Sequence, residues 1–278
     1  MSDNRPESLR EVAERLAAEA AEFVRRRRTE ILRDGADGAG VRAKSSPTDP
    51  VTLADTETEH LVRARLAQLR PGDGVLGEEG GGTADAAAVR WVVDPIDGTV
   101  NFLYGIPAYA VSIAAQIDGV SVAGAVADVA GGQVYSAAVG RGADVLVGGE
   151  RLPVRCNDGG ELSMALLGTG FGYAPQRRAA QAALLAQMLP VVRDVRRIGS
   201  ASLDLCMLAA GRLDVYYEHG LQVWDWAAGA LIAAEAGAVV VLPGDSGGGA
   251  APLLAAAPGV AAEFTSALDR FGGLRPLP

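Results

Sequence analysis

Acidic side chains are the residues of this sequence best suited to do chemistry. Asp94 and Asp97 stand three positions apart within Trp91–Phe102, with Pro95 between them and Gly98 directly after. An apolar run precedes them, so both carboxylates are expected where a buried strand opens into a loop, a place where α/β proteins bind ligands. Mg²⁺ takes one or two carboxylates and leaves positions for water and substrate phosphate. The string therefore predicts a cation site, although an Asp-x-x-Asp pair alone is more typical of a turn.

Three further acidic groups strengthen that prediction. Glu78 and Glu79 are adjacent in a glycine-flanked loop, and neighbouring carboxylates repel each other unless a cation or a basic group stabilises them. Asp225 stands between two tryptophans at the start of an alanine-rich helix. Two roles are open for it: a cap of that helix, or a metal ligand held by a rigid element. The Gly98–Thr99 amides, if they begin a helix, would face an anion held by the metal. Because the chain has 2 histidines, a His-rich zinc site is excluded.

The elements that must position these groups follow from hydrophobic periodicity and turn residues. We predict helices over about 7–33, 54–69, 176–188, 201–210 and 225–236, and strands over 89–93, 110–117, 120–128, 133–138, 165–167, 191–198, 213–217 and 238–242. Strands dominate the middle of the chain, and helices alternate with strands in its second half. No low-complexity linker or repeat interrupts the sequence. We therefore expect a single catalytic domain over 1–278, with lobes of about 1–150 and 151–278.

Composition restricts the class of protein. With 278 residues, 49% hydrophobic and 21% charged, the chain can bury a large core, which excludes a disordered or fibrous protein. A net charge of -9 disfavours nucleic acid as the general partner. Only Cys156 and Cys206 are present, and no run of about 18 apolar residues occurs. We expect a reduced, soluble, cytoplasmic protein without a membrane segment, and we interpret the basic run Arg25–Arg28 as a solvated helix face.

Taken together, these strings resemble the inositol monophosphatase family of metal-dependent sugar phosphatases, most closely its bacterial SuhB-type inositol-1-monophosphatases. The family's two signature regions match Trp91–Asn101 and Trp224–Gly237. Supporting matches occur in the family's order at Lys44–Asp49, Thr52–Asp55, Gly77–Glu79, Arg197–Ala201 and Tyr217–Glu218. These matches cover nearly the whole chain. The resemblance implies an α/β (α+β) fold, a layered αβαβα sandwich, assembled as a homodimer.

The resemblance also implies a role for each matching residue. The ligands of two Mg²⁺ ions would be Glu78, Asp94, the Ile96 carbonyl, Asp97 and Asp225. Glu78, Asp94 and Ile96 would hold the first ion, and Asp94 would bridge to a second held with Asp97 and Asp225. The catalytic residues near the first ion and its water would be Asp55, Glu79 and Thr99. Substrate and phosphate would be bound by Asp97, Gly98, Thr99, Ala201 (main chain), Glu218 and Asp225. Lys44 and Asp49 match a loop that closes over the site and helps to hold a third, weaker ion.

The expected reaction is Mg²⁺-dependent hydrolysis of a phosphate monoester by a metal-activated water, with inositol 1-phosphate as substrate. Three alternatives stay open. Relatives with the same motifs act on histidinol phosphate, fructose bisphosphate or adenosine 3',5'-bisphosphate. An aspartyl-phosphate enzyme also places paired aspartates after a strand, although with a different spacing. A regulatory protein that binds RNA or a transcription complex is the third alternative, and Arg25–Arg28 is its one hint in the sequence.

Overall fold

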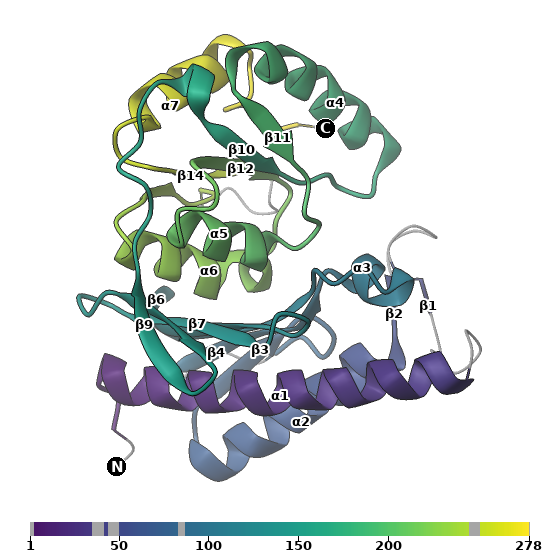
Figure 1. Ribbon diagram of the computed structural model, residues 1–278. Coiled ribbons are helices and arrows are strands. Elements are labelled where there is room, and N and C mark those ends of the chain that lie inside the picture. The colour runs from purple at the N-terminus through teal and green to yellow at the C-terminus, as the bar shows by residue number, and fades with distance from the viewer. Residues whose placement is uncertain (1–2, 35–41, 44–49, 83–86, 245–250, 278) are drawn as a thin grey trace.

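The computed structural model describes residues 3–34, 42–43, 50–82, 87–244 and 251–277, and its helices and sheets lie in alternating layers (Figure 1). The lowest layer in that view holds α1 (Pro6–Asp34) and α2 (Leu53–Leu69). A large sheet lies on them, and α5 (Ala201–Ala209) and α6 (Val223–Glu235) cover its other face. A smaller sheet follows, covered in turn by α4 (Pro175–Met188) and α7 (Ala261–Arg270). This arrangement confirms the layered αβαβα sandwich.

The large sheet is mixed and has seven strands. In spatial order they are β3 (Gly74–Gly77), β4 (Arg90–Asp97), β5 (Ala110–Ile117), β6 (Val120–Asp128), β7 (Gln133–Ala138), β8 (Ala143–Val147) and β9 (Glu150–Val154). Only the β3–β4 pair is parallel. Both faces of the central strands are buried, because α1 and α2 cover one face and α5 and α6 cover the other. Successive side chains along a strand point alternately to these two sides. Trp91 and Val93 pack on the former, and Val92 packs on the latter.

The small sheet has five strands. Their spatial order is β11 (Asp194–Arg196), β10 (Leu166–Thr169), β12 (Val215–His219), β14 (Pro252–Ala256) and β13 (Val239–Val241). Strand β10 pairs in parallel with both neighbours, and β14 pairs antiparallel with β12 and β13. The remaining elements are short: β1 (Arg42–Ala43), β2 (Pro50–Val51), α3 (Thr99–Tyr104) and the 3₁₀ turns η2 (Leu162–Met164) and η3 (Leu189–Val191).

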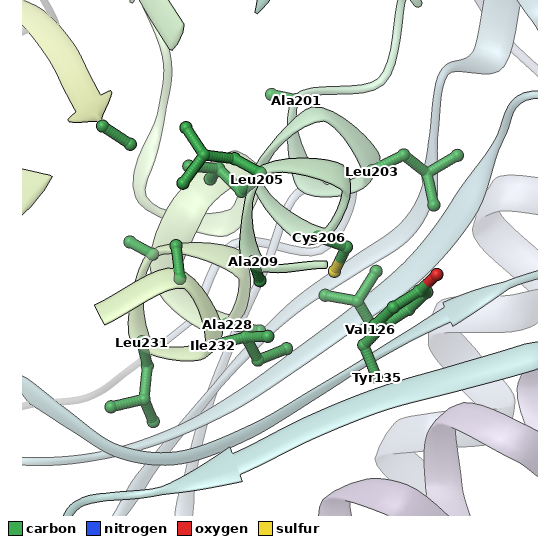
Figure 2. Packing of buried hydrophobic residues seen from close by; sticks show 14 of the residues in the cluster. Val126, Tyr135, Ala201, Leu203, Leu205, Cys206, Ala209, Ala228, Leu231 and Ile232 are labelled. Carbon is green, nitrogen blue, oxygen red and sulfur yellow. The ribbon is translucent and has the colours of Figure 1, made fainter. Parts of the chain in front are cut away.

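Helices α5 and α6 are apolar because sheets lie on both sides of them. Figure 2 shows Cys206 and Ile232, from the two helices, close to Val126 and Tyr135 of the large sheet. A Cβ at Gly124 of β6 would lie 3.0 Å from the Cα of Ala228, so the sheet approaches α6 closely at that glycine. The helices that begin at the candidate site are therefore fixed from both faces.

Several predicted boundaries need correction. Strand β4 does not end at Val93, as predicted, but continues to Asp97. An irregularity in its pairing with β5 places Pro95 and Ile96 opposite Val111 alone. A bulge tolerates proline, which has no N–H for the ladder. The strand predicted over 191–198 is shorter, since η3 occupies its start. The longer elements that the sequence reasoning missed are β3, β8, β9, β14 and α7.

The basic run of α1 makes contacts within the chain. Arg25 donates to the Val129 carbonyl at 3.2 Å, and Arg27 pairs with Glu30 and Glu57. The Arg28 guanidinium lies 5.8 Å from the centre of the Phe102 ring. The run is thus a partly solvated helix face, as interpreted from the sequence. Among the helices in the described ranges, none combines the length and apolar character that a membrane crossing requires.

Candidate active site

The end of β4 and the turn into α3 carry the central acidic pair. Asp94 is buried, with 1% of its surface exposed, and its Oδ1 accepts the Ile96 N–H at 3.1 Å. Gly98 follows with φ 95°, in the left-handed region. A Cβ at Gly98 would lie 2.9 Å from the Ala108 carbonyl oxygen and 3.1 Å from that of Gly199. Glycine at this position therefore lets the turn lie against two other segments, and α3 begins directly after it.

The start of α5 holds the second carboxylate of the pair. Asp97 Oδ2 accepts hydrogen bonds from Ser200 Oγ at 2.7 Å, from the Ser202 N–H at 2.7 Å and from Ser202 Oγ at 2.5 Å. Burial raises the pKa of Asp97, and these hydrogen bonds oppose that rise. Ala201 lies between the two serines and begins the helix. Sequence reasoning missed the roles of Ser200 and Ser202. The signal for Ser200 was its position directly before a helix, where serine is a recognised cap.

The start of α2 reaches the same turn from the other side. Asp55 is fully buried and forms a capping box with Thr52, whose N–H and Oγ1 donate to Asp55 Oδ2 at 2.9 and 2.5 Å. The Oγ1 of Thr99 lies 3.1 Å from Asp55 Oδ1 and 3.0 Å from the Ile96 carbonyl oxygen, and its one hydrogen is shared between these acceptors. The structure thus brings Asp55 and Thr99 into direct contact.

The turn after β3 carries Glu78 and Glu79, both half-buried. The Glu78 N–H donates to the Val93 carbonyl at 3.2 Å, which ties the turn to β4. The Glu79 N–H donates to Glu59 Oε2 at 2.8 Å. Glu59 lies on α2 and was missed by the sequence reasoning. Its one signal was the spacing of Glu59 and Arg63, four residues apart on a predicted helix, which form a salt bridge at 2.7 Å.

The second half of the chain supplies Asp225 and Glu218. Helix α6 begins at Val223, so Asp225 is not the cap residue but lies in the first turn, where its Oδ2 accepts the Gln222 N–H at 2.6 Å. Glu218 lies on β12 and accepts a hydrogen bond from the Tyr216 hydroxyl at 2.7 Å. Burial raises the pKa of Glu218 to about 7.

Electrostatic coupling shows that these acidic groups are neighbours. The pKa of Asp94 lies well above its usual range, because of burial first and then because of the charges of Glu78, Asp97, Asp225 and Asp55. The pKa of Asp225 is also raised well above its usual range, by burial and then by Asp97 and Glu78. Carboxylates from the α2, β3–β4 and α6 regions therefore lie around Asp94, as the motifs predict. Lys44 and Asp49 lie outside the described residues.

The chemistry of this donor set fits a hard divalent cation. The candidate ligands are carboxylates and the Ile96 carbonyl, all oxygen atoms, and their mutual repulsion is relieved when a cation binds between them. Within the residues that the structure describes, no three acidic, histidine or cysteine side chains converge closely enough to form a complete metal-binding set.

Comparisons with known proteins agree with this geometry. Residues 5–270 match the model of the inositol monophosphatase family. The chain is 68% identical to the inositol-1-monophosphatase of Mycobacterium leprae, across 99% of this chain and 98% of the relative. It is 41% identical to the Nus factor SuhB of Pseudomonas aeruginosa, across 69% of this chain and 72% of the relative. The solved structure of Mycobacterium tuberculosis SuhB superposes with a TM-score of 0.85 at 60% identity, across 98% of this chain and 100% of that chain.

Proposed function

The chain belongs to the inositol monophosphatase family and is a phosphoric monoester hydrolase, and we propose that it hydrolyses inositol 1-phosphate to myo-inositol and phosphate. The observation that carries this proposal is the gathering of buried carboxylates from distant segments around Asp94. Such a cluster is costly to build unless it binds cations. The similarity to a relative named inositol-1-monophosphatase, which extends over both chains, supports the choice of substrate.

We propose Mg²⁺ as the cofactor, with two or three ions in each site. Glu78, Asp94 and the Ile96 carbonyl would hold one ion, and Asp94, Asp97 and Asp225 would hold a second. Bound divalent cations neutralise charge on the phosphate and lower the pKa of water, so that hydroxide is available near neutral pH. The buried position of Asp94 supports its role as the shared ligand.

The protein's own groups would orient the attacking water and accept its proton. Because the hydroxyl hydrogen of Thr99 is directed to Asp55 and Ile96, its oxygen is left to accept a hydrogen bond from water. When the bound water forms the attacking hydroxide, its proton would pass to Thr99 Oγ1 while the Thr99 proton passes to Asp55 Oδ1, and Asp55 would then release a proton to solvent. Glu79 would orient the same water. No covalent enzyme–phosphate is formed in this scheme, and the leaving alkoxide takes a proton from solvent.

The substrate would be bound through its phosphate and its ring hydroxyls. We assign the phosphate to the Gly98 and Thr99 amides at the start of α3, where N–H groups lack acceptors within the helix. The ring hydroxyls would be bound by Asp97, the Ala201 main chain, Glu218 and Asp225. Asp97 and Ala201 are held together by the hydrogen bonds at the start of α5, which supports a shared role.

The decisive experiment measures phosphate release from inositol 1-phosphate, histidinol phosphate, fructose 1,6-bisphosphate and adenosine 3',5'-bisphosphate at several Mg²⁺ concentrations. We expect a clear preference for inositol 1-phosphate and a loss of at least about 100-fold in kcat/KM for Asp94→Asn. The matched control is Asp118→Asn, an exposed turn residue with φ 50°, a conformation that asparagine adopts readily. Preference for another substrate would replace the substrate assignment, and near-normal activity of Asp94→Asn would refute the bridging role.

Two alternatives are tested alongside. Rapid acid quenching during turnover distinguishes the two mechanisms, because an aspartyl-phosphate enzyme is trapped with phosphate bound to an aspartate, whereas direct attack by water leaves no phosphate on the protein. The similarity to a relative named Nus factor SuhB favours a second test, salt-dependent RNA binding. Binding that falls steeply with salt, in a protein that releases no phosphate, would favour the regulatory function.

We further propose that residues 1–278 form one catalytic domain, with lobes of about 1–150 and 151–278, and that two copies associate as a homodimer. Tyr104 and Ile106, which are 81% and 49% exposed, support a subunit contact near the end of α3, because large apolar side chains are commonly covered in assemblies. Light scattering during gel filtration measures the mass in solution, and a monomer at all concentrations would refute the dimer.

A further inference from the structure

Helix α2 brings two buried carboxylates to the site region, one turn apart. Asp55 and Glu59 are 0% and 1% exposed, and residues four apart lie on the same helix face. Asp55 contacts Thr99 at the start of α3, whereas Glu59 contacts a different segment, the turn after β3. The assignment of catalytic and ligand residues given above leaves Glu59 without a role.

Glu59 binds the backbone of the turn that carries the acidic pair. Its Oε2 accepts the Glu79 N–H at 2.8 Å, and its Oε1 accepts the Gly80 N–H at 2.9 Å. The Nε of Arg63 donates to the same Oε1 at 2.7 Å. A buried carboxylate is stable only when donors satisfy it, and charge-assisted hydrogen bonds of this kind are the stronger class. Glu59 is therefore a fully engaged anchor rather than an incidental buried charge.

Two glycines allow the turn to lie this close to Glu59. A Cβ at Gly77 would lie 2.4 Å from the Glu59 carboxyl group, and a Cβ at Gly80 would lie 2.6 Å from its Oε1. Neither glycine has a positive φ, so backbone freedom does not explain their presence. The glycines on both sides of Glu78–Glu79 are explained by contact with Glu59.

Arg63 connects Glu59 to the far side of the same turn. Its guanidinium donates to the Gly81 carbonyl as well as to Glu59. Gly81 in turn pairs with Gly77 across the turn. The Glu59–Arg63 pair therefore holds both sides of the turn through main-chain groups, and Arg63 compensates the charge of Glu59.

We propose that Glu59 is a positioning residue that orders the turn bearing Glu78 and Glu79 before a divalent cation binds. The Glu78 N–H donates to the carbonyl of Val93, the residue before Asp94, so like-charged carboxylates of the turn and of β4 lie near each other and repel when no cation is bound. Glu59 opposes this repulsion from behind, because its carboxylate binds the Glu79 and Gly80 backbone amides of the turn. The proposal rests on the proposed cation site, and only its kcat measurement rests on the proposed phosphatase activity.

The test compares Glu59→Gln with wild type by hydrogen–deuterium exchange at the Glu79 and Gly80 amides. Glutamine keeps the shape but replaces one acceptor oxygen by an NH₂ group, so at least one amide loses its acceptor. We expect that amide to exchange about tenfold faster, and the Mn²⁺ concentration for half-maximal binding, measured by spin resonance, to rise about tenfold. With Mg²⁺ at saturation, kcat should stay within about threefold of wild type.

The matched control is Glu57→Gln, a half-exposed acid on the same helix that pairs with Arg27. If Glu59→Gln does not fold, Gly80→Ala displaces the turn from the other side and decides the question by the same measurements. Unchanged amide exchange and unchanged Mn²⁺ binding in a folded variant would overturn the proposal. So would a loss confined to kcat. A wild-type protein without phosphatase activity would refute the proposed function instead, while exchange and Mn²⁺ binding would still test Glu59.

Discussion

At the scale of single residues, the surroundings of Glu218 place its change of charge near neutral pH. Burial raises its pKa to about 7, while the Tyr216 hydroxyl and the charge of Arg197 act in the opposite direction. Tyr216 and Glu218 are two positions apart on β12, so they lie on the same face of the strand. A Cβ at Gly170 would lie 2.0 Å from Glu218 Oε2, which leaves room for glycine alone beside this carboxylate. The strength with which Glu218 binds the hydroxyl groups of the substrate should therefore depend on pH.

This environment predicts how substrate binding changes with pH. Between pH 6 and pH 8 Glu218 becomes ionised, and a charged acceptor binds hydroxyls more strongly than a neutral one. We expect the KM for inositol 1-phosphate to fall by about fivefold over this range. Glu218→Gln should remove the dependence, and an aryl phosphate without ring hydroxyls is the control substrate. A KM that rises with pH, or the same profile in the variant, would contradict the assignment.

The same raised pKa also has a consequence for stability. An acid that titrates at a higher pH in the folded state than in the unfolded chain favours folding only while it is protonated. Its contribution is therefore present below pH 4.5, the usual pKa, and is lost as pH rises towards about 7. Glu218→Gln should lose less stability than wild type across that window, as thermal unfolding at pH 5 and pH 8 would show.

At the scale of elements, the site depends on helices and strands that end or begin at one place. Strand β4 ends at Asp97, α3 begins after Gly98, and α5 begins at Ala201. Gly98 lies between the carbonyl groups of Ala108 and Gly199. The end of β4 and the starts of α3 and α5 therefore lie in contact, and Gly98 occupies the position between them. A side chain there must push two segments apart.

Gly98→Ala tests this junction. The variant has both an unfavourable left-handed φ and a clash with two carbonyl groups, so we expect a loss of about 3 kcal/mol in the free energy of unfolding. We also expect at least about a tenfold loss in kcat/KM, because the phosphate-binding amides move. Gly119→Ala is the matched control, since Gly119 has φ 79° but nothing within 4 Å of the new Cβ.

The control separates the two causes. Gly119→Ala should lose about 1 kcal/mol, from backbone strain alone, and should keep its activity. Both free energies are measured by urea denaturation. Equal losses in the two variants would mean that contact with Ala108 and Gly199 is not what limits residue 98.

At the scale of the whole molecule, α1 is fixed across the large sheet by a buried ionic network. Arg10 is 9% exposed and donates to Glu14, to Ser136 of β7 and to Asp144 of β8. Arg151 of β9 reaches Glu14 from the other side at 2.7 Å. The network joins the first helix to the strands at one edge of the sheet, whereas the acidic site lies at the end of β4. A substitution in this network should therefore lower the stability of the protein and leave its catalytic activity nearly unchanged.

Arg10→Met tests that separation. Methionine keeps the apolar stem but leaves Asp144 and Glu14 with fewer partners, and we expect a loss of about 3 kcal/mol in the free energy of unfolding. Activity at 25 °C should stay within about twofold of wild type. The control is Arg5→Met, because Arg5 pairs with Asp3 at an exposed position, where solvent screens the charges and an ion pair contributes little to stability. Denaturation midpoints and steady-state kinetics check both claims, and a parallel loss of activity would contradict them.

Much of the fold could be predicted from local patterns in the sequence. The strands predicted over 110–117, 120–128 and 133–138 match β5, β6 and β7, and the first helix matches α1 to within one residue at each end. Period-2 and period-3.6 patterns report which side of an element is buried, and glycines report its ends. The strands β8 and β9 at the edge of the sheet were missed, because the side chains of β8 are mostly half-buried and those of β9 mostly exposed, so neither strand carries a strong apolar pattern.

The sequence by itself determined which residue types could form the site, because the carboxylates and their flanking glycines are written in short motifs. Only the tertiary structure decided which of them meet. Asp94 and Asp225 are neighbours because α6 packs on one face of the large sheet, against β4. Glu59 reaches Glu79 because α2 packs on the other face, behind β3 and β4. Such contacts join segments far apart in the chain, and they are selected by how the layers bury their apolar faces, which no local pattern encodes.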